Sequence, residues 1–413
     1  MEKINQSASI DQISVGIQFE KDIIPVGRLA IRNQDIFFEY HPDYISKGLN
    51  ISPFKLPLTQ GVQSFNPRLF EGLPGVFNDS LPDGWGRLLF DRLAKSKNLL
   101  PNQFSPLDRL AHIGRFGLGA LTYEPDQGHE SADTIIDLDS LATQTQEVLA
   151  GEADEVLNEL VKLNGSSAGA RPKALIGIDP NNQNILHGER QLRPDQEYWM
   201  VKFANSMDGP DAGAIEYVYS LMAQEAGISM TPTRLFPAKQ GAGYFATKRF
   251  DRTNKERFHM HTASGLLHSD FRVPVLDYED LLTLTEALTK DFREVEKMFR
   301  LAVFNVFSHN RDDHGKNFSF LMDKHGEWKM SPAYDLTFSS GPRGHQSTMV
   351  MGEGQNPSME HLIKLAKEGS LTQKQVELII EQTKEALCQW ETLAKHHDIS
   401  ASNIKLIKSR LQI

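Results

Sequence analysis

Three polar side chains in the last third of the chain have the types and the order that could transfer a phosphoryl group. Asp312 is followed by four residues and then by Asn317, and a second acid, Asp335, lies further along. In phosphoryl transfer from Mg-ATP, one carboxylate accepts the proton of the attacking hydroxyl group, and a carboxamide and another carboxylate hold the metal ions. This order predicts Asp312 as the base and Asn317 and Asp335 as the metal ligands.

The segments around these residues predict a scaffold that brings them together. Apolar residues recur at helical spacing over residues 278–289 and 292–307, and the polar run 308–316 then forms a loop. Residues 318–322 and 327–330 are typical of two short strands joined by a polar turn. Such a hairpin would return the second acid to the side of the carboxamide. The alternative is a surface loop that is only rich in Asp and His.

A second candidate for chemistry is the turn of small residues at 165–173, which follows a helix predicted over 141–163. Small side chains let backbone N–H groups approach phosphate oxygens closely, and Lys173 could add a positive charge. The turn is not a Walker loop, because the glycine spacing of that motif is missing. An ordinary flexible turn is the alternative.

A lysine on a strand after this turn strengthens the phosphate hypothesis. Lys202 lies in the predicted strand 198–203, and Glu216 lies near the start of the helix predicted over 214–226. Kinases use a strand lysine, held by a helix glutamate, to bind the donor phosphates. The alternatives are an edge-strand lysine that extends into solvent and a solvated glutamate. A later strand would lead into a hinge, where the main chain at Lys248, Arg249 and Phe250 could contact an adenine.

The composition is that of an ordinary soluble protein and excludes several classes. Of 413 residues, 39% are hydrophobic and 24% are charged, and the net charge is -10 with a pI near 5.8. Such an acidic chain does not coat nucleic acid by itself, because that needs a basic surface. The single cysteine, Cys388, excludes an internal disulfide and a thiolate zinc cluster. No signal peptide or membrane-spanning run is visible, so we expect a cytoplasmic protein without membrane contact.

Histidines near the catalytic stretch raise a metallohydrolase as another possibility. His309 and His314 are five residues apart, however, and no His-Glu-x-x-His pattern occurs. The sequence therefore disfavours a zinc site. We expect His314 to order the catalytic loop through hydrogen bonds or to contact a phosphate.

The sequence predicts an α+β, bilobal, protein-kinase-like fold, and we expect the chain to be divided into three domains. Residues 1–123 form a module with a small antiparallel sheet and helices, in which we expect Asp83, Trp85 and Arg87 to be structural. Residues 124–255 form a nucleotide-binding lobe, so that the N-terminal half is mixed α/β with antiparallel sheets. Residues 256–413 form an all-helical C-terminal lobe that carries the catalytic loop.

Together these residues resemble the HipA family, the serine/threonine kinase toxins of bacterial toxin–antitoxin pairs. The resemblance covers nearly the whole chain. It rests on the following segments: Val26-Gly27-Arg28-Leu29, Leu81-Pro82-Asp83-Gly84-Trp85-Gly86, Ala168-Gly169-Ala170-x-x-Lys173, Arg249-Phe250-Asp251-Arg252, Asp312-x-His314-x-Lys316-Asn317 and Tyr334-Asp335.

The resemblance implies an ATP- and Mg²⁺-dependent kinase whose targets include aminoacyl-tRNA synthetases. It implies that Asp312 accepts the proton, that Asn317 and Asp335 bind the metal, and that Lys202 binds phosphate. It further implies nucleotide contacts from three groups of residues and from the turn at Tyr334: Ala168, Gly169, Ala170, Arg171, Pro172 and Lys173; Lys248, Arg249 and Phe250; His314, Gly315, Lys316 and Asn317.

The resemblance also implies regulation. Autophosphorylation maps to Ser166, with Ser167 as the neighbouring substitute, and a dianion there would repel the ATP phosphates and expel the loop. The family partner is a HipB-like helix-turn-helix antitoxin, through which operator DNA would be bound. Two departures from the family pattern are Lys248, where an acid is usual, and the pair Arg171-Pro172 in the phosphate loop.

Two other functions stay open on the sequence alone. A small-molecule phosphotransferase also uses an Asp, four residues and an Asn, although the N-terminal module and the serine beside the phosphate loop argue against it. A catalytically idle, nucleotide-binding corepressor would act through protein contacts only.

Overall fold

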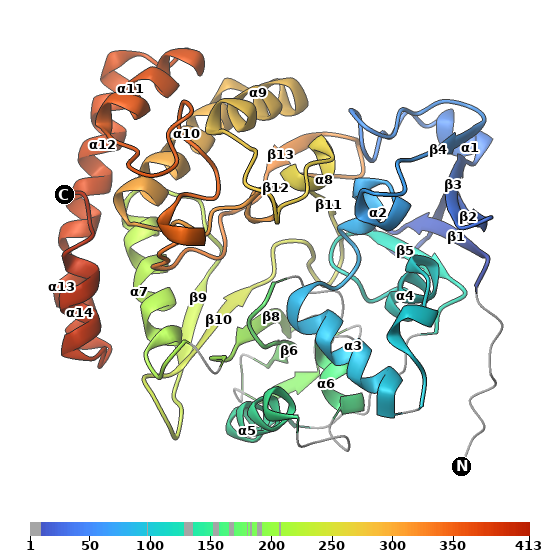
Figure 1. Ribbon diagram of the computed structural model, residues 1–413, viewed down its shortest axis with the longest axis horizontal. Helices are drawn as coiled ribbons and strands as arrows, with labels where there is room; N and C mark the ends of the chain where they lie inside the picture. The colour runs from blue at the N-terminus through green and yellow to red at the C-terminus, as the bar shows by residue number, and fades with distance from the viewer. Residues whose placement is uncertain are drawn as a thin grey trace. The chain divides into compact units, whose positions relative to one another are not determined.

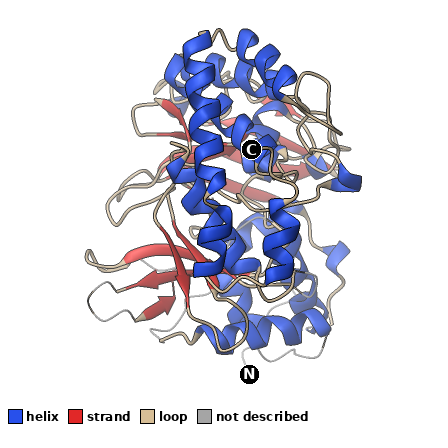
Figure 2. Ribbon diagram, turned by 90° about the vertical axis from the view of Figure 1, so that its left-hand side faces the viewer, coloured by secondary structure: helices blue, strands red, loops and turns tan. Residues whose placement is uncertain are grey.

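The computed structural model describes residues 10–96, 98–127, 135–151, 157–164, 169–179, 181, 184–187, 192–205 and 208–413 (Figure 1). The chain divides into two compact units, each built from several segments. The first comprises Met1–Met200, Asp251–His261 and Met322–Gly326, and the second comprises Val201–Phe250, Thr262–Leu321 and Glu327–Ile413. Figure 2 shows the mixture of helices and strands that makes this an α+β protein.

The first unit contains a five-stranded sheet in the order β4-β3-β2-β1-β5, with antiparallel neighbours throughout. A small residue is required at Gly27, because a Cβ atom there would lie 2.3 Å from the carbonyl oxygen of Glu39 on the paired strand. This contact explains the glycine in the Val-Gly-Arg-Leu motif. The strands are β1 (Gln12–Ile17), β2 (Ile24–Arg32), β3 (Asp35–Tyr40), β4 (Val62–Ser64) and β5 (Leu121–Glu124).

An aromatic cluster forms the core behind this sheet. The ring of Phe77 lies 5.0 Å from that of Phe38 and 6.4 Å from that of Tyr123, between ring centroids. The hydroxyl group of buried Tyr123 donates to Ser80 Oγ at 2.6 Å. The surrounding elements are α1 (Pro42–Ile45), η1 (Phe70–Gly72), α2 (Gly75–Asn78), α3 (Gly84–Ser96), η2 (Pro101–Gln103) and α4 (Pro106–Ile113).

The helix predicted over residues 141–163 is instead two helices, α5 (Leu138–Ala150) and α6 (Leu157–Asn164). The first ends at Gly151, which has a φ of 92° and donates its N–H to the carbonyl groups of Glu147 and Val148. Glycine adopts this left-handed conformation readily, so it terminates the helix. The antiparallel pair β6 (Lys173–Ile178) and β7 (Ile185–His187) follows, and the chain enters the second unit within β8 (Glu197–Lys202).

The second unit is mostly helical, as predicted for the C-terminal part. The helices α9 (Tyr278–Thr289) and α10 (Phe292–Phe307) have the predicted bounds, and the predicted hairpin is present as β12 (Ser319–Met322) and β13 (Trp328–Met330). The remaining elements are α7 (Ala212–Glu225), β9 (Thr233–Phe236), β10 (Tyr244–Lys248), β11 (His259–Thr262, shared with the first unit), α8 (Ala263–Leu267), η3 (Gly315–Asn317), η4 (Pro342–Gly344), α11 (Met359–Glu368), α12 (Gln373–Cys388), α13 (Trp390–His396) and α14 (Ala401–Lys408).

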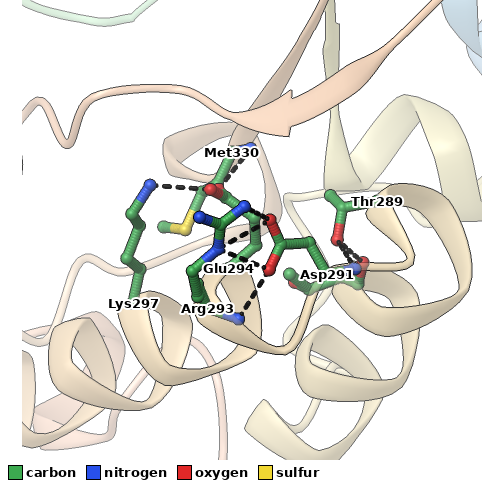
Figure 3. A network of polar contacts seen from close by, with 7 residues as sticks. Thr289, Asp291, Arg293, Glu294, Lys297 and Met330 are labelled. Carbon is green, nitrogen blue, oxygen red and sulfur yellow. Dashed lines mark hydrogen bonds and ion pairs between the residues drawn. The ribbon is translucent and has the colours of Figure 1, made fainter.

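The start of α10 holds the hairpin in place. Asp291 caps the helix by accepting the N–H of Arg293 at 2.9 Å. Glu294, which is buried, accepts a hydrogen bond from Lys297 Nζ at 2.7 Å and another from the main-chain N–H of Met330 at 2.9 Å (Figure 3). Because Met330 ends β13, this carboxylate fixes the hairpin to the helix that precedes the catalytic loop.

No helix among the described residues is long and apolar enough to cross a membrane.

A buried polar chain links three segments of the first unit. His261 contacts Asp79 Oδ2 through Nδ1 at 2.6 Å and Ser52 Oγ through Nε2 at 3.0 Å. His259, on the same strand, contacts the carbonyl oxygen of Ile51 through Nε2 at 2.8 Å. Burial, followed by the charge of His261, lowers the pKa of His259 to about 3. This imidazole is therefore neutral in the folded protein.

His259 makes the stability of the first unit depend on pH. The unfolded chain binds a proton below pH 6.5, whereas the folded chain does so only near pH 3, so the free energy of unfolding should fall as the pH is lowered between these values. We expect a loss of about 2 kcal/mol between pH 7.5 and pH 5. Urea unfolding followed by tryptophan fluorescence measures it. His259→Gln retains a donor for Ile51 but cannot titrate, so an equal pH dependence in this variant would contradict the assignment.

Candidate active site

The end of strand β8 carries Lys202, which is held between two carboxylates. Its Nζ donates to Glu216 Oε1 at 2.5 Å and to Asp335 Oδ1 at 2.6 Å. Burial alone would lower the pKa of Lys202, but the charges of Asp335 and Glu216 outweigh it and raise the pKa above its usual value. The lysine is therefore a fixed positive charge.

The two carboxylates differ in their access to solvent. The side chain of Glu216, on α7, is 2% exposed, whereas that of Asp335 is 32% exposed. The ring of Phe245 lies 5.7 Å from Lys202 Nζ and covers another side of the lysine. Solvent therefore reaches this cluster on the side of Asp335.

One hydrogen bond orders the catalytic loop internally, and a second joins it to the segment before Asp335. Asn317 Nδ2 donates to the carbonyl oxygen of Asp312 at 2.7 Å, which fixes the orientation of the carboxamide. The hydroxyl group of Tyr334 donates to the carbonyl oxygen of Lys316 at 2.5 Å. The residues that precede Asp335 and Asn317 are therefore in direct contact, and Asp335 itself has a φ of 59°, a conformation that Asp tolerates better than most residues.

A residue that the sequence did not single out, Asp313, organises this loop. It is buried, whereas Asp312 beside it is exposed. Its Oδ2 accepts hydrogen bonds from Tyr278 Oη at 2.6 Å and Gln346 Nε2 at 2.8 Å, and its Oδ1 accepts the N–H groups of Ser347 and Thr348, each at 3.1 Å. Despite these donors, burial raises the pKa of Asp313 to about 7.

The network around Asp313 extends into helix α10. Asn305 Nδ2 donates to the hydroxyl oxygen of Tyr278 at 2.9 Å, and Asn310 Nδ2 donates to Asn305 Oδ1 at 3.0 Å. Gln346 Nε2 also donates to the carbonyl oxygen of Asn310 at 2.9 Å. Buried polar groups thus hold the loop on both sides. The side chain of Asp312, in contrast, is exposed to solvent.

Three further predicted residues of this loop pack against the segment before α9. The rings of His314 and Phe271 lie 5.0 Å apart, and Lys316 Nζ lies 4.8 Å from the same phenyl ring. A Cβ atom on Gly315 would lie 2.9 Å from Leu276 Cδ1, so this position favours glycine. His314 therefore packs against Phe271, and its expected role through hydrogen bonds or phosphate contact stays a prediction.

The predicted phosphate loop lies in the first unit and is described only from Gly169 onward, so Ser166, Ser167 and Ala168 lie outside the described residues. The N–H of Gly169 donates to Asp83 Oδ1, and its carbonyl oxygen accepts the N–H of Trp85 at 3.0 Å. A Cβ atom on Gly84 would lie 2.5 Å from that carbonyl oxygen. The Asp-Gly-Trp segment, expected to be structural, thus contacts the phosphate loop directly.

The remaining residues of this loop lead into strand β6. Ala170, Arg171 and Pro172 form a bend, and Lys173 is the first residue of the strand. The Lys173 side chain is buried, and a Cβ atom on Gly169 would lie 2.5 Å from its Nζ. Lys173 Nζ therefore lies beside Gly169, and its contact with a phosphate stays a prediction.

The predicted hinge motif is divided between the two units after Phe250. In the second unit, Lys248 donates its N–H to the carbonyl oxygen of Pro232 at 2.9 Å, so a main-chain contact of Lys248 with a nucleotide would have to use its own carbonyl group. Arg249 is buried, and the rings of Phe250 and Tyr334 lie 5.5 Å apart.

In the first unit, the other half of the hinge motif binds the glycine-rich run at 114–119. Asp251 Oδ2 accepts the N–H of Gly119 at 2.8 Å, and Arg252 donates to the carbonyl groups of Gly117 and Gly119. Asp251 and Arg252 therefore hold the glycine-rich run of the first unit in place.

The metal ligands expected at Asn317 and Asp335 have suitable chemistry. Carboxylate and carboxamide oxygens are the donors that Mg²⁺ prefers, and Mg²⁺ commonly takes one or two protein ligands together with substrate phosphates. Since Asn317 Nδ2 is engaged by Asp312, its Oδ1 is the atom left for a cation. Among the residues that the structure describes, no three His, Cys, Asp or Glu side chains form a group that could hold a metal by themselves.

Comparisons with known proteins identify relatives over both halves of the chain. A family model described as the HipA-like C-terminal domain matches residues 165–390, and one described as the HipA N-terminal domain matches residues 21–124. The protein named "Putative kinase Y4mE" from Sinorhizobium fredii (strain NBRC 101917 / NGR234) is 30% identical over 402 residues, with 87% of each chain covered.

A solved structure shows the same fold. It is a chain of the complex of HipA, HipB and operator DNA from Shewanella oneidensis MR-1, with a TM-score of 0.69 at 16% identity. The match covers 96% of the present chain and 95% of the other. The fold expected from the sequence is thereby confirmed.

Replacing Asp313 should destabilise the second unit. Asp313→Ala leaves buried donors on Tyr278, Ser347 and Thr348 without their acceptor, and each such group costs about 1–3 kcal/mol. We expect a loss of about 3 kcal/mol or more in the free energy of unfolding, measured by urea denaturation. Asp312→Ala is the matched control, because its side chain is exposed, and it should change stability by about 0.5 kcal/mol at most.

The cost of Asp313→Ala should also depend on pH. The folded protein keeps the proton of Asp313 up to about pH 7, whereas the unfolded chain loses it near pH 4, so this residue contributes more stability at pH 5 than at pH 8. An equal cost at both values would contradict the raised pKa.

Gly84→Ala should loosen the phosphate loop. Its new Cβ atom would collide with the carbonyl group of Gly169, so we expect faster hydrogen exchange in peptides that cover residues 169–179. Gly48→Ala is the matched control. Gly48 also has a positive φ, of 71°, but nothing lies within 4 Å of the added atom. If the two variants showed equal hydrogen exchange in the peptides that cover residues 169–179, contact of the new Cβ atom with the loop would not be the cause of the faster exchange.

Proposed function

This chain belongs to the HipA family, and we propose that it is an ATP- and Mg²⁺-dependent serine/threonine protein kinase that acts as the toxin of a toxin–antitoxin pair. The observation that carries the proposal is the ion cluster of Lys202, Glu216 and Asp335. Protein kinases require both a strand lysine paired with a helix glutamate and an aspartate for the metal. In this chain, one ammonium group contacts both acids.

The residues of the second unit have distinct roles in this proposal. Asp312 is exposed, so it can meet the hydroxyl group of a serine or threonine on another protein and accept its proton. Lys202 binds the phosphates of ATP, with Glu216 as the buried acid that holds it extended. The buried Asp313 network keeps the loop in place, and little reorganisation is needed when the hydroxyl group arrives.

Asn317 and Asp335 would hold Mg²⁺ through carboxamide and carboxylate oxygens. When bound, Mg²⁺ neutralises negative charge on the phosphates and so stabilises the transition state. Asp335 contacts Lys202 directly, which keeps its carboxylate oriented in the absence of a cation. The hydrogen bond between Asn317 and the main chain of Asp312 couples the metal ligand to the base.

The first unit would supply the phosphate loop, Ala168 to Lys173. Asp83 and Trp85 hold Gly169 through its N–H and carbonyl groups, so they stabilise one conformation of the loop. Phosphorylation of Ser166, or of Ser167, would place a dianion beside this loop and repel the phosphates of ATP. The hinge residues Lys248, Arg249 and Phe250 would contact the adenine.

The partners are proposed by analogy with the HipA–HipB–operator complex of Shewanella oneidensis. We propose a helix-turn-helix antitoxin as the partner, with operator DNA bound mainly by that protein. The net charge of -10 agrees with this division, because the chain lacks the excess of basic residues that DNA binding needs. The protein substrate would be a component of translation, such as an aminoacyl-tRNA synthetase.

Asp312→Asn should abolish phosphate transfer without unfolding the chain. Loss of a general base typically reduces the rate at least about a hundredfold, or about 3 kcal/mol of barrier. Incorporation of radiolabel from γ-labelled ATP into the kinase and into lysate proteins measures the rate, and the melting temperature reports on the fold. Asp398→Asn, an exposed position with a φ of 56° that Asn tolerates, is the control.

Two outcomes would contradict the proposed function. Transfer by Asp312→Asn at the wild-type rate would exclude Asp312 as the base. A wild-type protein that binds ATP but labels neither itself nor any lysate protein would exclude a protein kinase. If transfer is observed, phosphoproteomics after parallel induction of wild type and Asp335→Ala would name the substrate.

A further inference from the structure

Three basic residues belong to two segments that meet at the end of α10, namely the start of the catalytic loop and the C-terminal tail, whose Gln412 N–H donates to the carbonyl oxygen of Phe307. His309 and Arg311 flank Asn310, and Arg410 belongs to the C-terminal tail after α14. Arg410 is close enough that its charge lowers the pKa values of both His309 and Arg311. For His309, burial is the largest cause, followed by Arg311 and Arg410, and its pKa falls to about 4.

The chain itself supplies little negative charge to this basic cluster. Arg311 donates from its guanidinium group to the carbonyl oxygen of Gly344, and Arg410 makes a main-chain hydrogen bond to Ile407. Among the described residues, neither arginine forms an ion pair with a carboxylate. Burial and then the charge of Arg410 lower the pKa of Arg311, and the charge of buried Asp313 opposes them. Like charges held together in this way favour a bound anion.

Three segments hold the basic cluster in place. The segment after Asp335 runs beside the loop, since Ser339 donates its N–H to the carbonyl oxygen of His309 at 3.2 Å and accepts the N–H of Arg311 at 3.3 Å. The His309 ring stacks on that of Phe338 at 5.5 Å. The tail is held by the N–H of Gln412, which donates to the carbonyl oxygen of Phe307 at 2.9 Å.

We propose that His309, Arg311 and Arg410 form a binding site for a phosphate monoester or inorganic phosphate. A phosphate monoester carries nearly two negative charges and three acceptor oxygens, which two guanidinium groups and an imidazole can satisfy together. The site is a compact cluster on an acidic chain, so it fits a single dianion better than the singly charged phosphates along a nucleic acid.

Two sources could supply this group. One is a phosphoserine in the adjoining segment: Ser339 is bonded to the loop through its main chain, and exposed Ser340 follows it. The other is a dissolved phosphate. In either case the anion would join the catalytic loop, the segment after Asp335 and the C-terminal tail. The site does not depend on the proposed kinase activity, because it is defined by charge and backbone contacts alone.

The test measures thermal stability of the full-length, phosphatase-treated protein. Inorganic phosphate is titrated against sodium chloride at constant ionic strength, and the melting temperature is recorded. At about ten times the dissociation constant, one bound phosphate should raise the melting temperature by about 2 °C. Arg410→Gln and Arg311→Gln should each weaken this response at least tenfold. Arg410→Gln is the cleaner variant, because the Arg410 side chain is exposed.

Arg293→Gln is the matched control, since its guanidinium group lies at the other end of α10, about 24 Å from the loop. It should respond to phosphate as the wild type does. The second arm maps phosphoserine at 339 and 340 in protein isolated from cells, and compares melting before and after phosphatase treatment. A fall in melting temperature for wild type but not for Arg410→Gln identifies the covalent source.

If dissolved phosphate raises the melting temperature of the wild type and Arg410→Gln abolishes this response, dissolved phosphate is the ligand. Either result supports the site. The proposal is wrong if wild type and Arg410→Gln respond equally to phosphate and to phosphatase, or if neither responds at all. Since no step requires ATP, a chain that lacks kinase activity could still pass the test.

Discussion

The rest of the site depends on the two ion pairs that the ammonium group of Lys202 makes with Glu216 and Asp335. Taking a charge out of water is unfavourable unless partners compensate it, and here a buried glutamate and a partly exposed aspartate do so together. The three residues come from β8, α7 and the segment after the β12–β13 hairpin. One charge therefore determines how a strand, a helix and a loop are placed within the second unit.

The catalytic loop is supported in a different way, by neutral and ionisable groups buried beneath it. Asp313 accepts hydrogen bonds from α9 and from residues 346–348, while Asn305 and Asn310 continue the network into α10. Buried polar groups that are hydrogen-bonded to one another specify one arrangement more strictly than apolar packing does. The two adjacent aspartates thus differ in their roles. The side chain of Asp312 faces solvent, and the side chain of Asp313 holds the backbone of the loop in place.

Much of this could be predicted from particular residues. Helical periodicity located α9 and α10 correctly, and the spacing from Asp312 to Asn317 identified the loop. Other features depend on contacts between distant residues. Asp83 binds the backbone of Gly169, and no local pattern around either residue indicates it. Two consecutive aspartates look alike in a sequence, so the burial of Asp313 could not be inferred. Gly151 was a visible signal for a helix end, but the apolar periodicity on both sides concealed it.

The division of the chain into two units has a consequence for how the protein can be altered. The backbone passes from one unit to the other after residues 200, 250, 261, 321 and 326. Neither unit is therefore a contiguous stretch of the gene, and a fragment that ends between these points would lack strands that its own core requires. An exchange of segments between related proteins should therefore preserve a unit only when all the segments of that unit come from the same parent.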